Sequence, residues 1–220
     1  MPVLRLPSLP ATAGKQHWGN LPGAALSLAI AEAANSAKRF TLLLTADSQS
    51  AERLEQELSF FAPELPVLHF PDWETLPYDL FSPHQDIISQ RIAALYRLPE
   101  LKHGILVVPI TTALHRLAPR RFLLGSSLVL DVGQRINVDD MRARLEATGY
   151  RYVDTVYEHG EFTVRGALID LFPMGSKQPF RIDLFDDEIE TLRTFDPETQ
   201  RSIDKVESIK LLPAREFPLE

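Results

Sequence analysis

The hydrophobic pattern in the first half of the chain alternates between helix-like and strand-like stretches. Residues 21–37 are rich in Ala and Leu and predict a helix, whereas residues 39–45 form an apolar run that predicts a strand buried on both faces. Asp47 and Ser48 offer N-caps for a second helix, which runs to about Phe61.

Three further stretches continue this alternation. Residues 67–70 and 104–109 predict strands, and residues 86–98 predict a helix with four large aliphatic side chains on one stripe. Alternating strands and helices are typical of a parallel sheet with helices packed on it. We therefore predict an α/β domain over residues 1–126.

The pattern changes near residue 126, where short strands separated by turn residues take over. Asn137 or Asp139 predicts the start of a helix, and Gly149 its end. The predicted strands cover residues 127–131, 152–157, 161–164, 167–172, 180–185, 188–194 and 206–212. This alternation indicates a second domain of the α+β class with an antiparallel sheet.

One predicted strand carries an aromatic side chain on its polar face. In residues 180–185 the apolar side chains at positions 180, 182 and 184 share one face, so Arg181 and Phe185 share the other. The same alternation places Arg165 on the outer side of its strand. Arginine and aromatic residues are enriched at binding hot spots, which favours an interface. Alternatively, Phe185 bends inward at the hairpin and both arginines are ordinary surface charges.

Composition narrows the possible functions. The chain has no cysteine, which excludes disulfides and thiolate zinc sites, and its net charge of −7 argues against strong nucleic-acid binding by this chain alone. Neither a secretory signal nor an apolar run long enough to span a bilayer occurs, so we expect a cytoplasmic protein without membrane contact.

Candidate catalytic features are weak. The glycine-containing stretch at residues 19–27 precedes a helix but lacks the lysine of a phosphate-binding loop. His159 is a possible general base, but we favour a turn residue bonded to nearby backbone. The carboxylates at residues 183–190 could hold a metal, but we favour a hairpin whose tip is at residues 186–187. We expect no catalytic residue, cofactor or metal ligand.

The segment at residues 72–79 is dense in aromatic and acidic groups. It could be a binding loop. We favour an ordered crossing in which Trp73, Leu76 and Tyr78 cover the core.

Five motifs in combination resemble one protein family. They are WETLPYD at residues 73–79, SPHQD at 82–86, EHGE at 158–161, VRGALIDLFP at 164–173 and RIDLFDDEI at 181–189. Together they resemble the N-terminal region of the bacterial transcription-repair coupling factors, and the resemblance covers essentially the whole chain. The last two motifs are also similar to UvrB, the damage-loading helicase of nucleotide excision repair.

The resemblance implies an architecture of two domains. Residues 1–126 would form the first part of a P-loop-NTPase-like domain with a degenerate nucleotide site. Residues 127–213 would form a smaller inserted domain that binds the repair ATPase UvrA. Residues 214–220 would begin the return into the first domain, as part of a longer protein.

The resemblance also implies a function. The positions that match the family's UvrA-contacting residues are Arg165, Arg181 and Phe185, the same three that strand alternation places outward. The chain would then be a non-catalytic adaptor that recruits UvrA to stalled RNA polymerase, with polymerase and DNA bound only by other parts of the longer protein. The alternative is a nucleic-acid-binding module of an ATP-dependent repair helicase. For the adaptor, we predict that Phe185→Ala or Arg181→Glu weakens UvrA binding at least about tenfold and leaves the fold intact.

Overall fold

The computed structural model describes residues 7–10, 12–75 and 82–218. Internal contacts divide the chain into two compact units. The first comprises Met1–Asp72 and Arg97–His115, and the second comprises Trp73–Tyr96 and Arg116–Glu220. The predicted domain boundaries near residues 126 and 213 stay a prediction.

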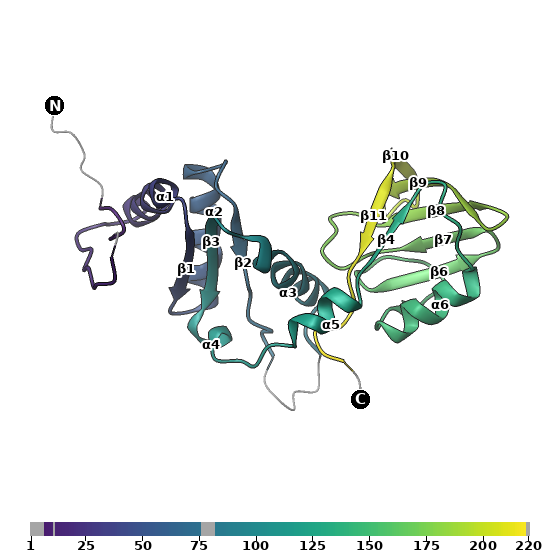
Figure 1. The fold of residues 1–220 in the computed structure, drawn as a ribbon, viewed down its shortest axis with the longest axis horizontal. Helices are drawn as coiled ribbons and strands as arrows, with labels where there is room; N and C mark the ends of the chain where they lie inside the picture. The colour runs from purple at the N-terminus through teal and green to yellow at the C-terminus, as the bar shows by residue number, and fades with distance from the viewer. Residues whose placement is uncertain (1–6, 11, 76–81, 219–220) are drawn as a thin grey trace. The chain divides into compact units, whose positions relative to one another are not determined.

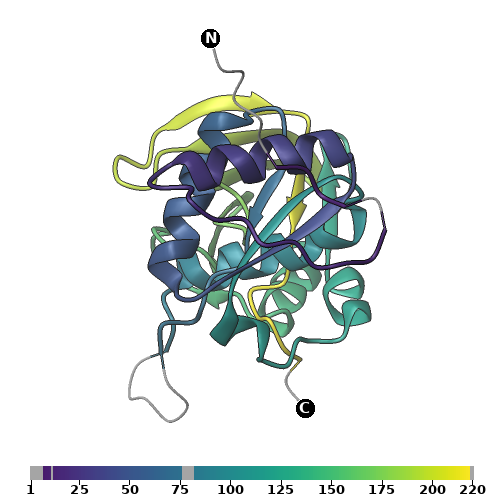
Figure 2. The same ribbon diagram turned by 90° about the vertical axis from the view of Figure 1, so that its left-hand side faces the viewer.

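The first unit is built on a small parallel sheet with the strand order β1-β3-β2. Its elements are α1 (Ala25–Ala37), β1 (Phe40–Thr45), α2 (Ser48–Phe61), β2 (Val67–His69), the 3-10 helix η1 (Leu98–Glu100), β3 (Gly104–Pro109) and α4 (Ile110–Ala113). The helices α1 and α2 contact each other and share an apolar core with β3 (Figure 1). Figure 2 shows these two helices, purple and blue, at the front of the view. The predicted parallel sheet with packed helices is confirmed.

Local signals in this unit act as predicted, with one difference. Asp47 caps α2, because its carboxylate accepts a hydrogen bond of 2.7 Å from the backbone N–H of Ser50. Strand β1 is only partly buried, since Leu42 is 52% and Leu44 48% exposed. The prediction that both of its faces are covered is therefore wrong. An apolar run identifies a strand, but it does not show that the strand lies at the edge of its sheet.

The second unit contains a six-stranded sheet with the order β10-β9-β8-β7-β6-β5 and a separate two-stranded ladder of β4 and β11. Its elements are α3 (Gln85–Arg97), α5 (Arg120–Gly125), β4 (Leu128–Asp131), α6 (Val138–Ala147), β5 (Arg151–Tyr152), β6 (Glu161–Arg165), β7 (Leu168–Leu171), β8 (Phe180–Phe185), β9 (Glu188–Phe195), β10 (Ser202–Val206) and β11 (Ser208–Leu211). All neighbouring pairs from β6 to β10 are antiparallel, which confirms the predicted antiparallel sheet (Figure 1).

One core lies on the inner face of this sheet. Strands β6 to β9 contribute Phe162, Ile169, Ile182 and Ile189, each at most 1% exposed, and helix α6 adds Met141. Helix α6 begins after Asn137, whose side chain accepts a hydrogen bond of 3.0 Å from the N–H of Asp140. A second, smaller apolar cluster of Val156, Phe172 and Phe195 is separate from this core.

Two strand predictions need correction, and one strand was not predicted. The strand expected at residues 152–157 is reduced to the two residues of β5, and the rest is loop. The strand expected at residues 206–212 corresponds to β11, and the separate strand β10 is missing from the prediction. Most of β10 is exposed, so its sequence lacks the apolar alternation that marks a half-buried strand.

Candidate partner-binding site

The outer face of the six-stranded sheet holds the three residues predicted to bind a partner. Strand β7 lies between β6 and β8, and Asp170 of β7 is paired in register with Arg181 of β8. Arg165 ends β6, two residues beyond Thr163, which is paired in register with Asp170. Pleat alternation therefore places both arginines and Asp170 on one face, as predicted for the arginines.

Phe185 is a highly exposed apolar side chain of this face. It ends β8 and is 75% exposed, although the preceding Leu184 is only 7% exposed and belongs to the core. The turn that follows is at Asp186 and Asp187, where Asp186 adopts a left-handed φ of 59°. The expected hairpin tip is confirmed, and the alternative that Phe185 bends inward is wrong.

Asp170 joins the two arginines. Its side chain is 1% exposed, and its carboxylate accepts hydrogen bonds from Arg181 Nε at 2.7 Å and from Arg181 Nη2 at 2.9 Å. A third bond of 2.5 Å comes from Arg165 Nη2. A buried carboxylate in this setting needs paired cations, because burying an isolated charge is costly.

The two arginines differ in how much of each guanidinium group is available. The Arg181 side chain is 15% exposed, whereas that of Arg165 is 52% exposed. Arg181 also donates to the carbonyl oxygen of Gln200 at 3.2 Å, and its guanidinium carbon lies 4.9 Å from the centre of the Phe195 ring. The hydrogen bonds to Asp170 raise the pKa of Arg181 above its ordinary value. Arg181 is therefore a fixed cation, and Arg165 is the more accessible one.

Sequence reasoning missed Asp170 as a member of this site. The signal was present, because Asp170 is the one charged residue in the otherwise apolar stretch at residues 167–172. A carboxylate in a strand of this kind is rarely buried without a cationic partner. Strand pairing then decides which cations it meets, and a single sequence does not give that pairing.

A second arginine–carboxylate pair lies in the interior of the same unit. Arg91 of α3 is 0% exposed and donates to both carboxylate oxygens of Glu216, at 2.7 and 2.8 Å. Trp73 Nε1 donates to the same carboxylate at 3.2 Å, and the guanidinium carbon lies 4.5 Å from the Trp73 ring centre. Trp73 thus covers a buried ion pair; Leu76 and Tyr78 of the same predicted crossing lie outside the described residues.

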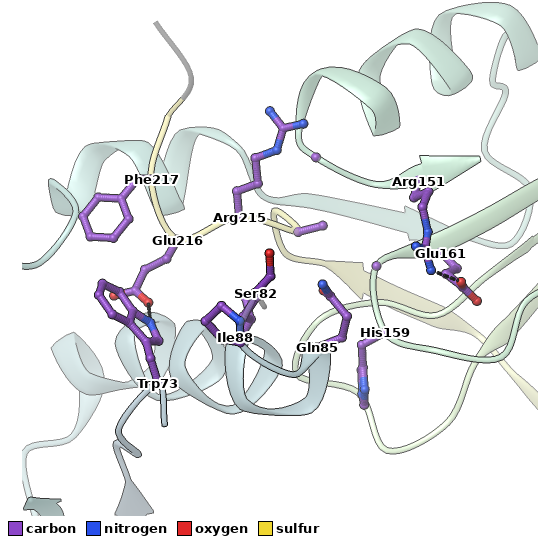
Figure 3. Close-up of a pocket in the computed structure, with 14 residues that line it drawn as sticks. Trp73, Ser82, Gln85, Ile88, Arg151, His159, Glu161, Arg215, Glu216 and Phe217 are labelled. Carbon is purple, nitrogen blue, oxygen red and sulfur yellow. Dashed lines mark hydrogen bonds and ion pairs between the residues drawn. The ribbon is translucent and has the colours of Figure 1, made fainter. Parts of the chain in front are cut away.

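Glu216 of this pair and Trp73 line a pocket of about 470 Å³, shown in Figure 3. Both carboxylates in its lining are already engaged. Glu216 is held by Arg91, while Glu161 accepts from the backbone N–H groups of Tyr157 and Glu158 at 2.8 and 2.9 Å and from Arg151 at 2.5 Å. Burial acts to raise the pKa of Glu161, but these three hydrogen bonds outweigh it and lower the pKa below its ordinary value. Such a carboxylate stays ionised at neutral pH and is a poor general acid.

His159, also at this pocket, is held on both ring nitrogens. Its Nδ1 lies 2.7 Å from the Asp86 carboxylate and its Nε2 lies 2.8 Å from the backbone oxygen of Ser176. The ring also packs against Phe172, at 4.0 Å between centroids. His159 lies in a turn, as predicted, but its ring bonds to two distant segments, so the predicted bond to nearby backbone is wrong. Within residues 7–10, 12–75 and 82–218, no cluster of three or more histidine and carboxylate side chains is arranged to hold a metal ion.

The comparison with protein families bears on the unit that holds this site. Residues 128–217 match the sequence model of the UvrB interaction domain. The matched range contains Arg165, Asp170, Arg181 and Phe185. The whole chain is similar to transcription-repair-coupling factors. The predicted resemblance is confirmed.

Individual coupling factors match nearly the whole chain. The transcription-repair-coupling factor of Escherichia coli K12 is 50% identical over 214 residues, which is 97% of this chain and 19% of that protein. The Haemophilus influenzae factor is 52% identical over 202 residues, or 92% of this chain and 18% of that protein. The Bacillus subtilis factor is 31% identical over 203 residues. The chain thus spans about a fifth of the length of these coupling factors. Among the helices in the described ranges, none has both the length and the apolar character to cross a bilayer.

Proposed function

We propose that this chain is a non-catalytic adaptor that binds UvrA through the outer face of its second unit. The observation that carries the proposal is a phenylalanine, 75% exposed, at the end of the strand that also carries Arg181, within a UvrB interaction domain. An exposed aromatic side chain close to arginines is the composition typical of a binding hot spot.

Each of the three residues has a different part in the proposed contact. Phe185 supplies an apolar anchor that becomes buried in the partner. Arg165, 52% exposed, supplies guanidinium donors that suit a carboxylate or a carbonyl of the partner. Arg181 stabilises the face within this chain, because most of its donors are already used by Asp170 and Gln200.

We further propose that the first unit has an NTPase-like fold with a degenerate nucleotide site. The supporting observation is at the start of α1, where Ser27 is buried and its hydroxyl donates to Glu57 of α2. In a working phosphate-binding loop this region would offer a lysine and a hydroxyl to phosphate and magnesium. Here the lysine is absent, and the Glu57 carboxylate accepts a hydrogen bond from the Ser27 hydroxyl.

The recruitment step is part of the same proposal. In a protein as long as the related coupling factors, other regions would bind RNA polymerase and DNA, and this chain would bring UvrA to the stalled polymerase in the cytoplasm. The competing function, a nucleic-acid-binding module, predicts duplex binding that weakens steeply with salt. The net charge of −7 favours the adaptor.

The test is a titration of purified UvrA against the chain and against Phe185→Ala. Truncation of a buried anchor costs about 2 kcal/mol or more, so we expect affinity to fall by at least about tenfold. Phe60→Ala is the matched control, since Phe60 is 79% exposed but lies on α2 of the first unit. We expect its affinity to stay within about twofold of the parent, as for a residue outside the interface. Equal affinity of the parent and Phe185→Ala would contradict the proposed site.

A further inference from the structure

We propose that Asp170 is the positioning residue for Arg165, and that it holds the Arg165 guanidinium group in the orientation that meets the partner. This inference rests on the proposed function, because it concerns the same face. It assigns to the interface a residue that is itself out of the partner's reach, since the Asp170 side chain is 1% exposed.

The asymmetry between the two arginines supports this role. Arg181 has three kinds of support besides Asp170: it is largely buried, it donates to Gln200, and it packs on the Phe195 ring. Arg165 is half exposed and ends β6 immediately before the turn at Gly166 and Ala167. Among the described residues, the one hydrogen bond of its side chain is that from Nη2 to Asp170. Loss of the carboxylate therefore affects Arg165 most.

The bonding pattern requires a carboxylate at this position. One oxygen of Asp170 accepts from Arg181 Nε, and the other accepts from both Nη2 groups. An asparagine has one oxygen and one NH₂ group. In either amide orientation at least one of the three donors faces another donor, and the charge between the two cations is lost. We expect Arg165 to leave the sheet surface and to sample many rotamers.

A double-mutant cycle on UvrA binding tests the coupling between the two residues. Asp170→Asn is compared with the parent, with Arg165→Ala and with the double variant, after circular dichroism has shown that each is folded. Coupled neighbours commonly interact strongly enough to change affinity about tenfold, so we expect a loss of this size from Asp170→Asn in the parent. In the Arg165→Ala background we expect a change of less than about twofold. A loss of equal size in both backgrounds would overturn the inference.

A spectroscopic readout separates positioning from a purely structural role and needs no UvrA. In the parent, the guanidinium NMR signals of Arg165 should show restricted rotation. In Asp170→Asn those signals should become averaged. An unchanged Arg165 signal would also overturn the inference.

Arg165→Lys provides a test that leaves the buried carboxylate in place. Lysine keeps the charge but lacks the planar fork that can contact Asp170 and a partner group at the same time. We expect its UvrA affinity to fall nearly as far as that of Arg165→Ala, and affinity at the parent level would overturn the inference. If the parent chain itself does not bind UvrA, the proposed function fails, and the NMR experiment still decides whether Asp170 holds Arg165.

Discussion

The second unit contains two arginine–carboxylate arrangements that differ in the number of cations and in their exposure. In the interior, Arg91 and Glu216 form a one-to-one pair with two hydrogen bonds, and both side chains are at most 4% exposed. On the outer face of the sheet, Asp170 is shared by Arg181 and Arg165, and one of these cations is 52% exposed.

The two arrangements differ in how much of the guanidinium group stays accessible to a partner. The guanidinium group of Arg91 is enclosed by Glu216 and Trp73, so the pair fixes the segment after β11 to α3. The shared carboxylate cannot neutralise both of its cations, so positive charge remains at the accessible Arg165. A closed pair therefore stabilises the fold, whereas the shared carboxylate leaves an accessible cation that the proposed partner could contact.

The largest effect should follow from breaking the closed pair. Arg91→Met leaves the Glu216 carboxylate buried without its cation, and breaking a buried pair in this way costs about 3–5 kcal/mol. We expect the free energy of unfolding, measured with urea and circular dichroism, to fall by about that amount. UvrA affinity per folded molecule should not change. Adding Glu216→Leu should restore part of the loss, and a stability equal to the parent in Arg91→Met alone would show that the pair does not stabilise the unit.

Removing either arginine from the shared carboxylate should lower the free energy of unfolding by less, and by different amounts for the two arginines. Arg181→Ala removes two of the three donors to Asp170, which should lower the free energy of unfolding by about 1.5–3 kcal/mol. Arg165→Ala removes one exposed donor, and its unfolding free energy should stay within about 0.5 kcal/mol of the parent. Equal losses from the two variants would mean that the arginines are equivalent.

The structure also changes one expectation from the sequence. Arg181→Glu was predicted to weaken binding while leaving the fold intact. Because Arg181 packs on the buried Asp170, glutamate there would bring two carboxylates together in a poorly solvated place. Loss of binding by that variant would not report on the interface alone, and Phe185→Ala is the cleaner test.

The smallest predicted effect concerns pH. Glu161 has a lowered pKa in the folded chain, so its contribution to stability is present above the unfolded carboxyl pKa of about 4.3 and is lost as pH falls through the folded pKa. Glu161→Gln removes this contribution. We expect the free energy of unfolding of the parent to decline more steeply below about pH 4.3 than that of the variant. Parallel curves across acid pH would exclude Glu161 as a source of acid sensitivity.

Much of the fold follows from local signals in the sequence. The caps Asp47 and Asn137 mark helix starts correctly, and strand alternation correctly gives an exposed Phe185 next to a buried Leu184. Residues that depend on distant partners were not predictable in this way. Arg91 is followed by Ile92 on an ordinary amphipathic helix, and only the approach of residue 216, 125 positions later, makes it a core residue.

The turn after β8 makes the distribution of charge on the outer face asymmetric. Arg165 is cationic, whereas Asp186 places a carboxylate at the hairpin tip directly after Phe185, and the neighbouring Asp187 lies 3.8 Å from Arg135. A partner that seats Phe185 in an apolar pocket can still rotate about that ring. Rotation by half a turn brings like charges together on the two sides, and such juxtaposition is strongly unfavourable. In the proposed contact, opposite charges on the two sides of a single anchor would therefore favour one docking orientation.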